Sequence, residues 1–495
     1  MLRFFIHSHY FAPLAFRKLH IGAVVLVLLF PPPASTISFQ QDFDLVILNG
    51  RVIDPETRRD EIANIGIRAG TVVLITSSTI RGRKTVDATG LVVAPGFIDI
   101  LSSTKADKET HIQKLHDGIT TTFGMHGGPL NTEEYHRQMS AAGPLLNYGR
   151  AVGDRVLRVA AGATDAYKPA TPAQLERMRQ LAETAICSGA AGIGFGINYA
   201  PGESYEEVFA LFETAAKHNV PCHVHARYKG NFFPETMSLA AMEVISVAAA
   251  TGAHAELVHL TSSTVGSAPL TIRLIEGAAR NGVKVGFNLH VWTRNETSLQ
   301  SALYDPGWQE RFGGISYEQI YVADTQEQLN KSRFYELRKQ KDPVQVQTEF
   351  IKDEEIEMAL RSSLGVVTSD GGGLDDGKGH PRSVGTFARF LRVYVRENKV
   401  LPLMEALKRI TLVPAQRLEG AVARMKRKGR LQEGSDADIT IFDPQQVREM
   451  ATYKDPSRKS EGVHFVLVKG VLVLEKGQTP ANVAPGQWLR HQCSN

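Results

Sequence analysis

The stretch Pro221-Cys222-His223-Val224-His225 is a short, mostly apolar run that ends on a histidine, and Ala255-Glu256-Leu257-Val258-His259 repeats this pattern further along the chain. Residues 237–250 lie between the two runs and have the apolar spacing of an amphipathic helix. A short strand, a helix and a second short strand in this order indicate a parallel βαβ unit.

The same alternation continues on both sides of this unit. The expected strands are residues 120–123, 191–195, 221–225, 255–259, 284–289 and 365–369, and the expected helices include residues 205–217, 237–250 and 270–281. Repeated units at this spacing favour an α/β fold of the (β/α)8 TIM-like barrel type over a doubly wound sheet. We expect the barrel to occupy residues 94–419, with an insertion at about residues 293–355, where a polar stretch interrupts the alternation.

The two flanks of the barrel region have a different pattern. Short apolar runs are separated by turns such as Asn49-Gly50 and Lys469-Gly470, which is typical of β-hairpins. Because both flanks share this pattern, we predict one small β-sandwich domain built from residues 37–93 plus 420–485.

The amino terminus has the features of an export signal. Arg17 and Lys18 precede an apolar run at residues 21–30, which is followed by prolines and small residues. A run of this length is too short to span a bilayer but suits a signal peptide. We therefore expect residues 1–36 to be a signal peptide, and the mature chain to be periplasmic or secreted without a membrane span.

Composition restricts the partners. The net charge of +4 is small and is spread over the 495 residues without basic blocks, which argues against nucleic acid. Cys187, Cys222 and Cys493 are an odd, sparse set that does not indicate a disulfide framework, although few cysteines are compatible with export. A small-molecule substrate is the expected partner, and the sequence leaves a homo-oligomer open.

Candidate catalytic residues follow the expected strands, at the end where barrel enzymes carry their chemistry. They are His126, His225, His259 and Asp370. Taken singly, any one of the 16 histidines is better explained by an ordinary core or surface role, but three imidazoles and a carboxylate at successive strand ends favour a zinc site. Asp370 is the best candidate for a general acid and base, and capping of the next turn is its structural alternative.

Three further residues have open interpretations. His223 lies on the same strand face as His225 but deeper in the barrel, which favours a packing or supporting role. Cys222 points the other way and is expected to be a small core residue. Arg382 could bind a substrate carboxylate through two hydrogen bonds, and a structural ion pair is an equally good explanation.

These residues, together with seven ordered motifs, resemble the N-acyl-D-amino-acid deacylases of the amidohydrolase superfamily, especially the N-acyl-D-glutamate deacylase branch. The motifs are residues 49–55, 94–99, 117–121, 198–202, 369–371, 380–387 and 428–438. The resemblance extends over nearly the whole expected mature chain.

The resemblance implies a role for each matching residue. His225 and His259 match the two histidines that hold the tightly bound metal, and Asp370 matches the catalytic aspartate. His126 falls where these families place a metal-binding cysteine or glutamate. Substrate contacts are implied for Tyr199 and Arg382, which match positions near the substrate carboxylate. A further implied substrate-binding residue is His290, which with Trp292 stands where the family usually has a Tyr-Pro-Tyr turn.

One departure from the family pattern concerns the metal. Leu101 and Ser103 fall where the family has a His-x-His pair of metal ligands. Leucine cannot coordinate, and a neutral serine hydroxyl is a poor zinc ligand. We therefore expect one Zn²⁺ per chain, held by His126, His225 and His259, which would lower the pKa of a bound water to about 7.

The predicted function is hydrolysis of the amide C–N bond of N-acyl-(D-)amino acids or similar small amides by a single zinc-activated water. The missing His-x-His pair motivates an alternative from another class, a catalytically silent amidohydrolase-like binding module. Hydrolysis of a lactone or cyclic amide would use the same groups, so the sequence does not separate it from the first prediction.

Overall fold

A computed structural model describes residues 43–493, which lie within one compact unit, Asp42–Asn495. The expected signal peptide, residues 1–36, lies outside the described residues. Within the described range, no helix is both long and apolar enough to cross a membrane.

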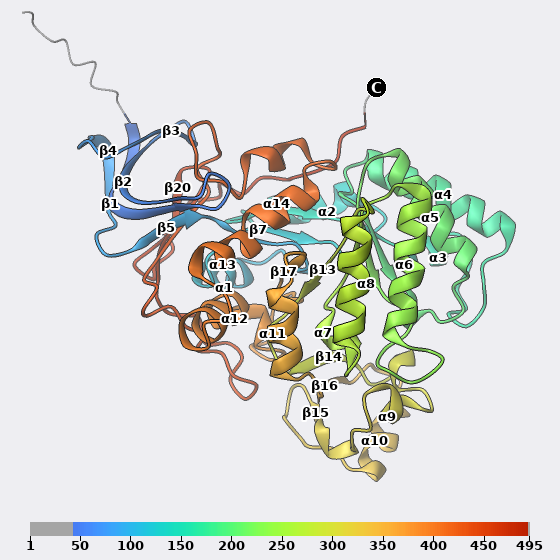
Figure 1. The fold of residues 1–495 in the computed structure, drawn as a ribbon. Coiled ribbons are helices and arrows are strands. Elements are labelled where there is room, and N and C mark those ends of the chain that lie inside the picture. Colours follow the sequence, from blue (N-terminus) through green and yellow to red (C-terminus); the bar gives the residue numbers. More distant parts are fainter. Residues whose placement is uncertain (1–42, 494–495) are drawn as a thin grey trace, which may run out of the picture. The chain divides into compact units, whose positions relative to one another are not determined.

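The centre of the molecule is the expected (β/α)8 barrel (Figure 1). Its parallel strands are β6 (Phe97–Asp99), β7 (Ile119–Gly124), β8 (Asn147–Arg150), β9 (Val152–Gly153), β10 (Ile193–Gly196), β11 (Cys222–His225), β12 (Ala255–Leu257), β13 (Val285–Leu289) and β17 (Gly365–Val367). They pair in the orders β6-β7-β8 and β9-β10-β11-β12-β13-β17. Only Ala151 separates β8 from β9, so the two form one strand position and the ring has eight.

Helices cover the outside of this ring. They are α1 (Lys108–His116), α2 (Thr132–Ala141), α3 (Asp154–Ala160), α4 (Pro172–Cys187), α5 (Tyr205–Lys217), α6 (Met237–Thr251), α8 (Ala268–Arg280), α11 (Asp353–Arg361) and α12 (Arg382–Arg389), whereas the one-turn helix α7 (Thr261–Thr264) follows β12. Figure 1 shows α4, α5, α6 and α8 side by side on one flank. The chain then continues through the π-helical segment η4 (Phe390–Glu397), α13 (Leu403–Ile410), α14 (Leu412–Leu418) and η5 (Ala423–Arg427).

Helix ends follow local sequence signals. Helix α5 has the predicted bounds because Ser204 and Glu207 form a capping box that satisfies free backbone N–H groups at its start. Helix α8 begins earlier than predicted, at Ala268, because Pro269 is tolerated in the first turn. Helix α6 ends at Gly252, whose φ of 74° suits glycine.

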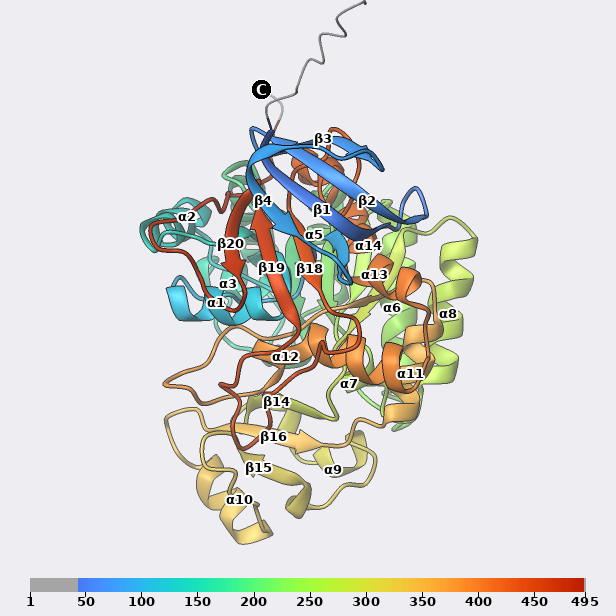
Figure 2. The ribbon, with the colours of Figure 1, turned by 90° about the vertical axis from the view of Figure 1, so that its left-hand side faces the viewer.

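Both flanks of the chain meet in one eight-stranded sheet, and Figure 2 shows its strands β20, β19 and β18 side by side. Its strands are β1 (Phe43–Asp54), β2 (Arg59–Arg68), β3 (Thr71–Thr76), β4 (Gly82–Asp87), β5 (Val92–Pro95), β18 (Ile439–Phe442), β19 (Val463–Val468) and β20 (Val471–Glu475), in the order β20-β19-β18-β5-β1-β2-β3 with β4 beside β1. Strand β18 is antiparallel to β5, with Ile441 opposite Val93. These two residues belong to an apolar core separate from that of the barrel.

The interrupted region forms a small unit of its own. It contains β14 (Arg294–Ser298), β15 (Ile320–Val322) and β16 (Gln345–Glu349), with η2 (Ala302–Tyr304), α9 (Trp308–Arg311), η3 (Tyr317–Gln319) and α10 (Lys331–Arg338). Its aromatic side chains pack together, and the rings of Trp308 and Phe334 stack with centroids 5.2 Å apart. The same residues join the apolar core of the barrel, so the unit is anchored over it.

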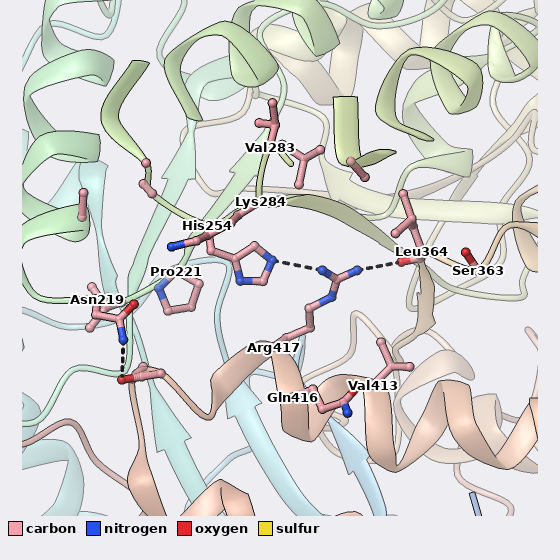
Figure 3. Close-up of a pocket in the computed structure, with 18 of the residues that line it drawn as sticks. Asn219, Pro221, His254, Val283, Lys284, Ser363, Leu364, Val413, Gln416 and Arg417 are labelled. Carbon is pink, nitrogen blue, oxygen red and sulfur yellow. Dashed lines mark hydrogen bonds between the residues drawn. The ribbon is translucent and has the colours of Figure 1, made fainter. Parts of the chain in front are cut away.

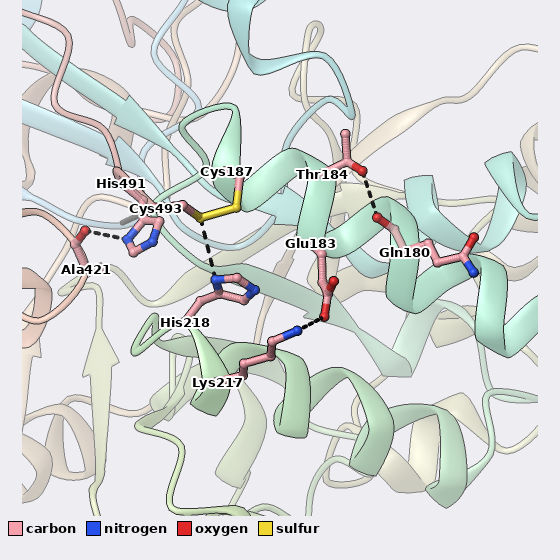
Figure 4. Close-up of a disulfide and its surroundings, with 9 residues drawn as sticks. All are labelled: Gln180, Glu183, Thr184, Cys187, Lys217, His218, Ala421, His491 and Cys493. Carbon is pink, nitrogen blue, oxygen red and sulfur yellow. Dashed lines mark hydrogen bonds and ion pairs between the residues drawn. A yellow bond between two sulfur atoms is a disulfide. The ribbon is translucent and has the colours of Figure 1, made fainter. Parts of the chain in front are cut away.

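A disulfide joins the end of α4 to the carboxyl-terminal segment (Figure 4), which the cysteine count did not predict. It links Cys187 to Cys493, which are 306 residues apart in the sequence. Backbone hydrogen bonds hold the same segment beside β8, since Leu489 N donates to Tyr148 O at 2.8 Å. The Trp488 ring stacks on His136 with centroids 4.2 Å apart. Cys222 is free and buried, as expected for a small core residue.

Because this cross-link closes a very long loop, it should restrict the unfolded chain strongly. We expect Cys493→Ser to lower the free energy of unfolding by about 2–4 kcal/mol in urea titrations without reductant. With a reductant present, the variant and the wild type should unfold alike. A difference that persists after reduction would show that packing of the sulfur, not the cross-link, is responsible.

Candidate active site

The carboxyl ends of the barrel strands surround a cavity of about 350 Å³. Its lining includes His126, Arg155, Asn198, Tyr199, His225, Lys229, His259, Ser262, Glu296, Leu303, Asp370 and Arg382. Most of these residues end a strand or lie in the loop that follows it, which is where this fold presents functional groups. The cavity therefore contains six of the seven residues that the sequence singled out.

His225 and His259 face each other across this cavity. His225 is the last residue of β11, whereas His259 lies two residues beyond the end of β12 and has a φ of 34°. Its backbone N–H donates to the side-chain oxygen of Asn288 on β13 at 2.8 Å, which holds the strained turn. The Nε2 atom of His259 and the Nδ1 atom of His225 are 2.7 Å apart.

A neighbouring hydroxyl determines which nitrogen of His259 carries the proton. Ser262 Oγ donates to His259 O at 2.9 Å and also lies 2.7 Å from His259 Nδ1. Since a hydroxyl has one proton, Nδ1 must donate to it, and Nε2 keeps its lone pair. Burial lowers the pKa of both His225 and His259 well below the usual value, so both rings are neutral near pH 7. The 2.7 Å separation is a hydrogen bond in which His225 Nδ1 donates to His259 Nε2, and neutral imidazole nitrogens of this kind are suitable ligands for a divalent cation such as zinc.

His126 stands apart from this pair. It lies just beyond β7, its Nε2 is 2.9 Å from Ser103 Oγ, and its ring centroid is 6.0 Å from that of His225. The Nδ1 atom is buried without a hydrogen-bond partner. Within residues 43–493, only Cys187, His218 and Cys493 place three potential ligand atoms within 4.8 Å of one another. The structure therefore does not bring His126 together with His225 and His259 as one group of three ligands, and His126 contacts Ser103, from the expected His-x-His position.

Asp370 and Arg382 form an ion pair at the edge of the same cavity. Asp370 Oδ2 is 2.8 Å from Arg382 Nη1, and both side chains are largely buried. Asp370 follows β17 and has a φ of 52°, a conformation that non-glycine residues rarely adopt. The structural alternative for Arg382 is therefore present, and the guanidinium orients the carboxylate that was expected to transfer protons.

A buried network places Asp370. Asp99 ends β6, and its carboxylate accepts hydrogen bonds from the backbone N–H and the hydroxyl of Ser369, the residue before Asp370. Lys114 Nζ lies 3.3 Å from the same carboxylate, and both side chains are fully buried. The first and last strands of the ring are thus joined next to the catalytic candidate.

Two other expected substrate-binding residues differ in position. Tyr199, in the short helix η1 (Ile197–Tyr199), lines the cavity with its ring centroid 5.5 Å from that of His225. His290 does not line the cavity and is fully buried. Its Nδ1 accepts a hydrogen bond from Trp292 N at 3.3 Å, and burial lowers its pKa to about 3. The structure therefore places His290 behind the site. His223 is also fully buried, in keeping with an internal role.

Several cavity residues were not predicted as site residues from the sequence. Arg155, Asn198, Lys229, Ser262 and Glu296 all line the cavity. Lys229 and Ser262 lie three or four residues after His225 and His259, in the loops that follow those strands. The rule that such loops build the site of a barrel enzyme could have directed attention to both.

A larger cavity of about 630 Å³ lies at the opposite ends of the strands (Figure 3). Its lining includes His254, Lys284, Lys408 and Arg417, and no carboxylate. Arg417 contacts His254 and the Leu364 carbonyl. Without a carboxylate or a pair of facing histidines, this cavity lacks the groups for hydrolysis, so the smaller cavity is the candidate active site.

Comparisons with known proteins agree with this geometry. A model of the amidohydrolase family matches residues 355–474. The chain is 29% identical to an N-acyl-D-glutamate deacylase of Alcaligenes xylosoxydans xylosoxydans over 92% of its own length and 98% of that protein. It is 28% identical to a D-aminoacylase of the same organism, over 89% and 96% of the two chains. The crystal structure of an N-acyl-D-glutamate deacylase from Bordetella bronchiseptica, complexed with zinc and a phosphonate inhibitor, superposes with a TM-score of 0.78 at 25% identity, covering 91% of this chain and 100% of that one.

The fold and the site define a barrel hydrolase of the metal-dependent class. The amidohydrolase family model matches part of the chain, and over most of its length the chain is similar to the N-acyl-D-amino-acid deacylases. The resemblance inferred from the sequence motifs is thereby confirmed.

Close backbone packing beneath His126 leads to a prediction about the site. A Cβ atom on Gly194 in β10 would lie 2.3 Å from Gly127 N and 2.4 Å from the carbonyl carbon of His126. We expect Gly194→Ala to lower the free energy of unfolding by about 1–3 kcal/mol, because the backbone must shift. Gly277→Ala in α8, where the nearest atom is 3.8 Å away, is the matched control and should be neutral or slightly stabilising. Equal urea unfolding curves for the two variants would contradict the packing argument.

Proposed function

We propose that this chain hydrolyses the amide C–N bond of N-acyl-D-amino acids or similar small amides with one bound zinc ion. The observation that carries the proposal is the pair of facing nitrogens on His225 and His259, set in one cavity with Asp370. The relatives named above, which are deacylases of N-acyl-D-amino acids or D-aminoacylases, support the substrate class.

Different residues of the cavity would bind the metal, transfer the proton and bind the substrate. His225 and His259 would hold the metal, and His126 is the third proposed ligand. Zinc bound there would polarise the substrate carbonyl and lower the pKa of a water molecule. Asp370, oriented by Arg382, accepts the proton of the attacking water and delivers it to the leaving nitrogen. Tyr199 and the remaining donors of Arg382, which line the same cavity, would bind the substrate carboxylate.

The proposal of a single metal ion rests on the first strand of the barrel. Leu101 is fully buried and carries no ligand atom, and the Ser103 hydroxyl is hydrogen-bonded to His126. No imidazole from this strand is therefore available for a second ion, in contrast to a family pattern with two histidines there.

Metal analysis together with two variants tests this function. We expect elemental analysis to find about one zinc per wild-type chain, a value near zero for His225→Ala, and an unchanged value for Asp370→Asn. On a panel of N-acetyl-D-amino acids, Asp370→Asn should lower kcat by about 10²- to 10⁴-fold, because proton transfer is lost. His464→Ala, a change in β19 outside the cavity, is the control for metal content and turnover.

Three results would contradict this proposal. About two zinc ions per wild-type chain would show that a second site exists despite Leu101 and Ser103. Wild-type turnover that survives Asp370→Asn would remove the assigned proton carrier. No metal and no turnover would favour the catalytically silent binding module.

We also propose that the mature chain is periplasmic or secreted. The Cys187–Cys493 disulfide supports this location, because disulfides persist in oxidising compartments. Thiol titration of denatured, unreduced protein from an exporting host should detect only Cys222. Free thiols at Cys187 and Cys493 would contradict an oxidising location.

A further inference from the structure

Lys229 is a buried cation without a carboxylate partner in the active-site cavity. It lies four residues after His225, in the loop that follows β11, and is 6% exposed. No ion pair or hydrogen bond of its Nζ is present within residues 43–493, and Asp370 and Arg311 are the charged groups with the largest effects on it. Buried lysines are usually paired, so the absence of an internal partner points to a ligand.

Aromatic rings hold this ammonium in place. Lys229 Nζ lies 4.5 Å from the ring centroid of Phe312 and 4.7 Å from that of Phe350. Such rings attract a cation but supply no formal negative charge. Burial, followed by the nearby Arg311 charge, lowers the pKa of Lys229 to about 7, so an anion bound beside it would stabilise the charged form.

The position of Lys229 relates it to the substrate. A second cavity of about 530 Å³ adjoins the active-site cavity, and Asn198, Lys229 and Leu303 line both. The ammonium group of Lys229 therefore lies where the two cavities meet. A substrate too long for the active-site cavity would place its end distant from the scissile bond at this point.

No carboxylate around this junction forms an ion pair with Lys229 within the described residues, although Glu235 also lines the adjoining cavity and Asp154 and Glu296 line the active-site cavity. Arg382 is already paired with Asp370. In the adjoining cavity Asp305 is paired with Arg338, and burial raises the pKa of Glu203 and favours its neutral form. Arg311 adds a further positive charge to the same lining, with backbone carbonyls as its hydrogen-bond partners.

We propose that Lys229 binds a second carboxylate of the substrate, distant from the scissile amide. The preferred substrates then carry this carboxylate either on the acyl group or on the amino-acid side chain. This inference rests on the proposed amide hydrolysis and specifies its substrate class.

Steady-state kinetics with three substrates shows whether the second carboxylate lies on the acyl group or on the amino-acid side chain. N-acetyl-D-leucine has no second carboxylate, N-acetyl-D-glutamate has it on the side chain, and N-succinyl-D-leucine has it on the acyl group. We expect one of the two dicarboxylates to exceed N-acetyl-D-leucine in kcat/KM by about 10- to 100-fold in the wild type, as for a hydrogen-bonded charge pair. Lys229→Met should remove this ratio mainly through KM, whereas Lys408→Met, in the cavity at the opposite end of the barrel, should keep it.

Binding measurements keep the inference testable without turnover. By isothermal titration calorimetry, wild type should bind glutarate more tightly than butyrate, and both Lys229→Met and Lys229→Gln should lose this difference while retaining cooperative thermal unfolding. A wild type without a dicarboxylate preference, or folded variants that keep it, would overturn the role of Lys229. A Lys229-dependent preference without cleavage of any amide would instead refute the proposed function and leave the dicarboxylate site standing.

Discussion

The buried carboxylate of Asp99 is the constraint on which the site depends. It ends the first barrel strand and binds both the backbone and the hydroxyl of Ser369 after the last strand, with Lys114 as its counter-ion. A buried charge is stable only when it is paired and hydrogen-bonded, so this network requires the ring to be closed at one defined register. Asp370 is the next residue, and its strained backbone and its ion pair with Arg382 are held from there.

The segment after the first barrel strand lacks the two histidines that the family resemblance predicts as metal ligands. Two residues after Asp99 the family's first ligand is replaced by Leu101, and the second is replaced by Ser103, whose hydroxyl contacts His126. The opposite wall keeps His225 and His259 with facing nitrogens, and Ser262 fixes the tautomer of His259. His225 and His259 share the cavity lining with Lys229, Tyr199 and Arg382.

Much of this arrangement was predictable, and the exceptions have physical causes. Apolar periodicity located the strands and placed His225, His259 and Asp370 at the functional end, because parallel strands of a barrel all point the same way. It missed the Cys187–Cys493 disulfide, since sequence spacing does not show that residues 306 positions apart meet. The family resemblance implied substrate contact for His290, whereas the structure places this residue outside the cavity lining. Lys229 escaped notice because a lysine in a loop is normally exposed.

The sequence by itself determined the (β/α)8 barrel, the sheet shared by both chain ends, the candidate metal ligands and the loss of the His-x-His pair. These features depend on local periodicity, on turn chemistry and on which side chains carry ligand atoms. Only the tertiary structure decided that Arg382 pairs with Asp370, that Ser103 contacts His126, and that Lys229 is buried over Phe312 and Phe350 with no ion pair to another described residue. Each of these contacts joins residues that are separated in sequence, so only the folded chain sets the distance between them. Folding also removes water from the charged groups, which strengthens their electrostatic interactions and shifts their pKa values.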